Sequence, residues 1–223
     1  MNIKNNINYF RQTLPEKCKL IVVSKTQALE KLEEAYQCNQ RIFGENKTQE
    51  LVPKYNALPK DIEWHMIGHL QSNKVKYIAP FVHLIHGVDS LSLLQEINKQ
   101  ARKNSREIKC LMQMFIAEEE TKFGFSEEEV LHLLNNPAFL SLDHIKIIGL
   151  MGMATFTEDK SQVRNEFKKL NIFFEQLKAL NLPRQVEMKE LSMGMSNDYT
   201  IAVEEGSTMV RIGTAIFGER NYD

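Results

Sequence analysis

The sequence has 223 residues, of which 43% are hydrophobic, and its formal net charge is -1. This length supports one domain with a sizeable core, and the near-neutral charge gives no electrostatic case for binding nucleic acid or membranes. No apolar run approaches the ~20 residues of a membrane span, and the first residues lack the apolar core of a secretory signal. Three cysteines without a CxxC pair indicate reduced thiols, so we expect a cytoplasmic protein.

Strands and helices are predicted to alternate along the chain. A leading helix over about residues 3–14 precedes eight short segments that are typical of strands, and amphipathic segments separate them. The predicted strands span residues 19–26, 41–46, 63–70, 82–90, 107–117, 145–154, 187–196 and 208–217. After the fifth strand, Ser126 and Glu129 have the spacing of a helix-capping box.

This alternation predicts an α/β fold in which the strands pair in parallel through right-handed crossovers. In a chain of this size, eight strands match a closed (β/α)8 TIM barrel. We expect a single domain over residues 1–223, with the leading helix outside the barrel. An open doubly wound sheet is the alternative, but no GxGxxG fingerprint of a dinucleotide site follows the first strand.

TIM barrels carry their functional groups at the carboxyl ends of their strands, and Lys25 lies at such an end. Partial burial would lower the pKa of its amine, and a neutral amine attacks an aldehyde to form a Schiff base. The alternative is a lysine that merely reaches solvent from a strand end. Other polar or small residues at predicted strand ends are Ser24, Glu45, Asn46, His69, Gln71, Ser192, Ser196, Arg211, Gly213 and Thr214.

A second feature follows the seventh and eighth strands, where TIM barrels often bind phosphate. Gly213 would let the backbone approach an anion, and Ser196 and Thr214 can donate hydroxyl hydrogen bonds, although ordinary glycine turns are the alternative. We expect this cradle to face Lys25 across the mouth of the barrel. Pyridoxal 5′-phosphate (PLP), with an aldehyde at one end and a phosphate at the other, would span the two. Arg211 would then face the pyridine nitrogen as a donor that stays charged, which disfavours carbanion chemistry.

Eight motifs also resemble one known family, over about residues 19–220. They are VVSKT, FGEN–TQE, WHMIGHLQSNK, HGVDSL, EEETKFGF, GLMGMA, ELSMGMSND and VRIGTAIFGER. On these motifs the chain is similar to the YggS/PROSC-type pyridoxal phosphate homeostasis proteins. The resemblance implies a barrel like the N-terminal domain of bacterial alanine racemases, with PLP on Lys25 of the SKT motif. The cofactor-binding residues we expect are Lys25, Asn46, Ser192, Ser196, Arg211, Gly213 and Thr214, with Lys122 of ETKFG as a secondary contact.

The function we expect is that of a monomeric PLP carrier that buffers the reactive aldehyde as a lysine Schiff base and releases it to PLP-dependent apoenzymes. A small PLP-dependent racemase is the alternative. Racemisation needs an acid and a base on opposite faces of the substrate. By the resemblance, one of them in alanine racemases is a tyrosine whose arrangement depends on a further C-terminal domain, and this sequence ends at Asp223, soon after the eighth strand. A barrel that uses Lys25 only as a charge for a phosphate ligand is a third possibility.

Histidine pairs give no expectation of a metal site. His65 and His69 are four apart on a predicted strand, so their side chains would be ~13 Å apart, and His69 is expected to line the pocket instead. His83 and His86 have opposite parity on their strand and cannot both point inward.

Overall fold

The computed structural model describes residues 2–117 and 123–218. Eight parallel strands close into a barrel in which each strand pairs with the next along the chain and β8 pairs with β1. The strands are β1 (Lys19–Val23), β2 (Ile42–Glu45), β3 (Glu63–Met66), β4 (Leu84–Val88), β5 (Ile108–Gln113), β6 (Ile145–Met151), β7 (Val186–Met195) and β8 (Met209–Ile212). The predicted TIM barrel is confirmed.

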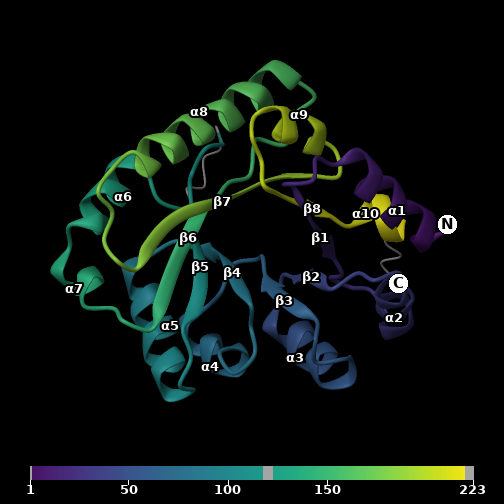
Figure 1. Ribbon diagram of the computed structural model, residues 1–223, viewed down its shortest axis with the longest axis horizontal. Coiled ribbons are helices and arrows are strands. Elements are labelled where there is room, and N and C mark those ends of the chain that lie inside the picture. The colour runs from purple at the N-terminus through teal and green to yellow at the C-terminus, as the bar shows by residue number, and fades with distance from the viewer. Residues whose placement is uncertain (1, 118–122, 219–223) are drawn as a thin grey trace.

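Helices surround this barrel on its outside (Figure 1). They are α1 (Ile3–Thr13), α2 (Leu29–Gln37), α3 (Thr48–Ala57), the 3-10 turn η1 (Ser72–Lys74), α4 (Val75–Ile78), α5 (Leu91–Lys103), α6 (Glu127–Leu134), α7 (Pro137–Leu140), α8 (Lys160–Lys178), α9 (Tyr199–Glu204) and α10 (Thr214–Phe217). The predicted capping box begins α6: Ser126 Oγ accepts from the Glu129 amide at 3.2 Å, and Glu129 Oε2 accepts from the Ser126 amide at 2.7 Å. No helix in the described ranges combines the length and apolarity needed to cross a membrane.

The leading helix α1 packs against the last described elements of the chain, and Figure 1 shows it beside α10. Phe10 is buried and meets the Tyr199 ring edge-on, with ring centroids 5.2 Å apart. Asn6 Nδ2 donates to the Ile216 carbonyl at 2.9 Å. The predicted helix therefore lies outside the barrel, as expected, and supports the segments that follow β7 and β8.

Strand alternation separates two apolar cores. Val22 points outward into the large core between the strands and the helices, whereas Ile21 and Val23 point into the barrel. The buried apolar residues inside the barrel are Ile21, Val23, Ile67, Leu84, Leu111, Met151 and Met209. The barrel interior also contains buried polar side chains, which are described with the site below.

Seven of the eight strands are shorter than the sequence predicts, among them the third and the eighth. The third ends at Met66 rather than residue 70, and the eighth ends at Ile212 rather than residue 217. After Ile212 the chain forms a helical turn, in which the Phe217 amide donates to the Gly213 carbonyl at 3.0 Å. The strand-like run after Ile212 is apolar because Ile216 and Phe217 are buried against the core from a helix. An apolar run this short does not distinguish the two structures.

Candidate functional site

Lys25 lies just beyond β1, at the carboxyl end of the barrel that we call the upper rim. Asn46 follows β2 and Gly213 follows β8. Since β8, β1 and β2 are neighbours in the barrel, these three positions occupy one side of the rim, with strands ~4.8 Å apart. The expectation that the segment after β8 faces Lys25 across the mouth is therefore wrong, because barrel closure brings the last strand next to the first.

A buried ion pair fixes the backbone just before Lys25. Ser24 Oγ donates to Glu45 Oε1 at 2.6 Å, and Lys54 Nζ donates to the same oxygen and to the Ser24 carbonyl, each at 2.7 Å. Burial raises the pKa of Glu45, and the hydrogen bonds and positive charge of its partners oppose that rise. On the other side of Lys25, Thr26 has a φ of 63° and its amide donates to Glu50 Oε2 at 2.6 Å. Hydrogen bonds with side chains therefore fix the backbone on both sides of Lys25.

Arg211 is buried inside the barrel and remains a cation. Its Nη1 donates to the Ser192 carbonyl at 2.9 Å and to Ser192 Oγ at 2.7 Å, and its Nη2 donates to the Gly152 carbonyl at 3.1 Å. Burial lowers the pKa of Arg211 to about 10, with the Asp198 charge acting against that shift, so the guanidinium is protonated at neutral pH. Within the described ranges no carboxylate forms an ion pair with it, and its hydrogen bonds use three of about five N–H groups.

Ser192 is therefore placed below the rim rather than on it. It is fully buried and holds the Arg211 guanidinium through both its carbonyl and its hydroxyl. The hydroxyl also lies 3.0 Å from His86 Nδ1, and His86 Nε2 lies 2.9 Å from His65 Nδ1. Burial holds the pKa values of both imidazoles well below the usual range, so both are neutral at neutral pH.

This histidine chain was not predicted from the sequence. A histidine of inward parity within the apolar strand LIHGV was the available signal for His86. His83 was expected to have the opposite parity on the same strand, but it precedes β4 and its ring stacks on that of His65, with centroids 5.6 Å apart, so the parity argument does not apply to it. His65 and His69 do not share a strand. His69 was expected to line the pocket, but its side chain is 58% exposed and its Nδ1 lies 3.1 Å from Asp89 Oδ2. His69 belongs to the loop after β3, which ends at Met66.

The segments after β7 and β8 contain the predicted phosphate-binding residues. Ser196 is half-buried in a turn where Asp198 Oδ1 accepts from the Met195 amide at 2.5 Å, and Thr214 is exposed at the start of α10. A Cβ on Gly213 would lie 3.1 Å from the Val23 carbonyl oxygen, so this glycine lets β8 approach β1 closely. Lys122, the predicted secondary contact, lies outside the described residues.

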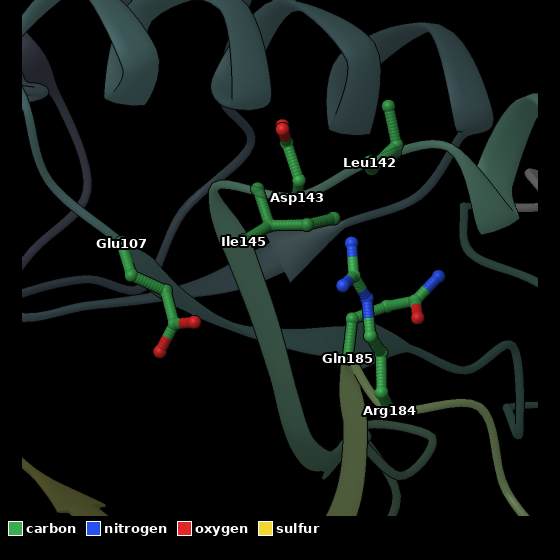
Figure 2. A pocket seen from close by; sticks show the side chains of 6 residues that line it. All are labelled: Glu107, Leu142, Asp143, Ile145, Arg184 and Gln185. Carbon is green, nitrogen blue, oxygen red and sulfur yellow. The ribbon is translucent and has the colours of Figure 1, made fainter.

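One hollow in the described part of the chain lies away from these residues. It has a volume of about 360 Å³ and is lined by Glu107, Leu142, Asp143, Ile145, Arg184 and Gln185 (Figure 2). These residues lie where β5, β6 and β7 begin, at the end of the barrel opposite Lys25, which we call the lower end. The candidate site is therefore assigned from its chemistry: an amine at a strand end, neutral donors beside it, and a buried guanidinium below.

The closed parallel barrel makes this a TIM-barrel protein, and its candidate site lies at the carboxyl end of the strands, where TIM barrels carry their functional groups. The chain matches the family model described as "Alanine racemase, N-terminal domain" over residues 1–221. A pyridoxal phosphate homeostasis protein of Aquifex aeolicus is 43% identical over 209 residues, which are 93% of this chain and 90% of that protein. One of the same name from Haemophilus influenzae is 39% identical over an alignment of 235 positions, which covers 100% of this chain and 98% of that protein.

A solved structure supports the same relationship. PipY of Synechococcus elongatus PCC7942, determined with PLP bound, superposes with a TM-score of 0.87 at 33% identity, covering 97% of this chain and 100% of that one. The chain belongs to the alanine racemase N-terminal domain family and, within it, to the pyridoxal phosphate homeostasis proteins. The resemblance found in its motifs is confirmed.

Proposed function

We propose that the protein binds PLP at the upper rim and carries it as part of intracellular PLP homeostasis, with Lys25 as the point of covalent attachment. One observation carries this proposal: a strand-end lysine and a buried, protonated Arg211 without a carboxylate partner in the described ranges share one end of one barrel. The names of the curated relatives and the PLP-bound state of PipY support it.

The donor set at the rim fits this cofactor. When bound, PLP would supply an aldehyde as its reactive group, and Lys25 would hold it through the side-chain amine. Arg211 has N–H groups left over for the pyridine nitrogen, and because it donates and stays charged it would keep that nitrogen unprotonated. Ser192 orients Arg211 from below. Asn46 would contact the cofactor from the end of β2.

The phosphate would be held by the segments after β7 and β8. Ser196 and Thr214 offer hydroxyl donors, and the backbone at Gly213 lies beside the end of β1. Neighbouring strands are ~4.8 Å apart, so the rim from β7 through β8 to β1 has the extent of one small ligand. Lys25 and these donors can therefore hold opposite ends of PLP while lying side by side on the rim.

The carrier role is favoured over catalysis. Racemisation needs an acid and a base on opposite faces of the substrate, and an unprotonated pyridine nitrogen makes PLP a weak electron sink. The relatives are named for homeostasis. We infer that the protein acts in the cytoplasm as a monomer and releases PLP to apoenzymes. Incubating the PLP-loaded protein with L-alanine and assaying the D-isomer tests this directly, because sustained turnover would establish the racemase instead.

Absorption spectroscopy tests the attachment. The purified protein mixed with PLP should show a band near ~420 nm that the Lys25→Ala variant lacks. Lys47→Ala is the matched control, since Lys47 is an exposed lysine at the same rim, next to Asn46. If the protein stays colourless but still binds a simple phosphate ester, the result would instead support the alternative function, in which Lys25 serves only as a positive charge for a phosphate ligand.

A further inference from the structure

A group of potential metal ligands lies at the lower end of the barrel, remote from Lys25. Glu63 begins β3, His65 follows two residues later, and His83 immediately precedes β4, the neighbouring strand. One ligand atom from each of the three lies within 4.8 Å of the others. His83 Nε2 is 3.6 Å from Glu63 Oε2, and the rings of the two histidines are nearly parallel, at 11°, with centroids 5.6 Å apart.

His65 supplies a second, independent indication of a ligand. Its side chain is almost completely buried, yet its Nε2 has no hydrogen-bond partner anywhere in the described part of the chain. Leaving a buried polar atom without a partner destabilises the folded state, so such atoms are normally satisfied by a partner or a ligand. Its other nitrogen, Nδ1, lies 2.9 Å from His86 Nε2. A histidine that ligates a metal usually donates its second ring N–H in this way, which fixes its tautomer and orientation.

We propose that Glu63, His65 and His83 bind one divalent transition-metal ion of the Zn²⁺ class. Two imidazoles and one carboxylate form a donor set that suits Zn²⁺. Bonds of about 2.1 Å in a tetrahedral site place ligand atoms about 3.4 Å apart, so the His83–Glu63 pair is nearly in position. The Glu63 and His83 side chains are 45% and 37% exposed, and rotating them closes the remaining distance while leaving a coordination position open to water.

The ion would tie β3 to the segment before β4 at the lower end of the barrel. Positive charges set a limit on its affinity, because Lys19, Lys109 and Arg106 lie close enough to act on these histidines. Glu190 pairs with Lys19, and Arg106 donates to two backbone carbonyls, which directs part of this charge elsewhere. Because these positive charges are only partly compensated, we expect moderate affinity for the metal ion rather than a permanently filled site.

Metal titration of the full chain tests this proposal. Chelator-treated protein should take up equimolar Zn²⁺ in competition with a chromogenic zinc indicator, and Co²⁺ in its place should give visible d–d absorption. Losing one neighbouring outer-shell group typically weakens metal binding about 10- to 100-fold, so losing a ligand should cost at least that much. We expect His83→Ala and Glu63→Gln each to weaken Zn²⁺ binding at least about tenfold. Both side chains are partly exposed, so both variants should fold.

His144→Ala is the matched control. His144 is a partly exposed histidine beside a carboxylate, with Nε2 3.9 Å from Asp143 Oδ1, but it has no third ligand among the described residues. This variant should bind Zn²⁺ like the wild type. Equal binding in all variants, or none in the wild type, would overturn the proposal. Neither readout involves PLP, so the metal site can fail while the PLP proposal stands, and the reverse also holds.

Discussion

Two buried cations differ in how they are neutralised. Lys54 reaches from α3 to the end of β1 and donates to a carboxylate, Glu45, which is itself fully buried. Arg211 projects from β8 into the barrel, and among the described residues it donates only to neutral oxygens of Ser192 and Gly152. Burying a charge is costly unless partners compensate it. Lys54 thus completes a structural ion pair, whereas Arg211 retains donors for a ligand.

The largest effect expected from this comparison is on stability. Lys54→Met leaves the Glu45 carboxylate buried without its cation, and breaking a buried pair in this way costs about 3–5 kcal/mol. Urea denaturation should show this loss in the free energy of unfolding. The double variant Glu45→Gln/Lys54→Met should recover most of it. If Lys54→Met is as stable as the wild type, the pair is not the structural element described here.

The next effect is on cofactor retention at Arg211. Arg211→Ala removes a charged hydrogen bond, worth about 1.5–3 kcal/mol, so the dissociation constant for PLP should rise about 10- to 100-fold. Covalent attachment at Lys25 should persist, and destabilisation should be smaller than for Lys54→Met. Equilibrium dialysis and absorbance measure the two properties. Failure to form the covalent bond at all would show that Arg211 does not face the pyridine nitrogen.

Smaller effects are expected at the phosphate. Ser196→Ala and Thr214→Val each remove one neutral hydroxyl donor, worth about 0.5–1.5 kcal/mol. Each should weaken PLP binding about 2- to 10-fold, while pyridoxal without its phosphate should bind equally to variant and wild type. Unchanged PLP affinity in both variants would place the phosphate elsewhere.

The smallest effect is a dependence on pH. Burial raises the folded-state pKa of Glu45 above its ordinary value of 4.5. At pH values between the unfolded-state pKa and this raised folded-state pKa, the folded protein binds more protons than the unfolded chain. Stability from Glu45 therefore falls as pH rises through this window. Subtracting the Glu45→Gln curve from the wild-type curve should isolate this slope. An exposed control, Glu30→Gln, should leave it unchanged; a difference slope of opposite sign would contradict the assignment.

Strand periodicity predicted a large part of this arrangement. The apolar runs gave eight strands in the correct order and placed Lys25 just past the first, because local alternation encodes both. The Ser126–Glu129 capping box was also readable, since its hydrogen bonds are local. The position of Gly213 beside β1 follows from the predicted closed barrel, whose eighth strand pairs with its first, and the expectation that this segment faces Lys25 across the mouth was inconsistent with that closure.

Long-range polar pairs were not predictable. The bond between Lys54 and Glu45 requires the register of α3 on the barrel, and the chain from His65 through His86 to Ser192 joins three strands. Nothing in the separation of these residues along the sequence signals such contacts. Composition reveals which polar side chains exist, and tertiary packing decides which of them meet.

Borohydride reduction of the PLP-loaded protein tests the central claim most directly. Reduction makes the bond between lysine and cofactor permanent, and mass spectrometry of a protease digest then locates it. We predict one modified peptide, bearing the phosphopyridoxyl group on Lys25. Label on another lysine, or no label under conditions where the cofactor is bound, would contradict the account.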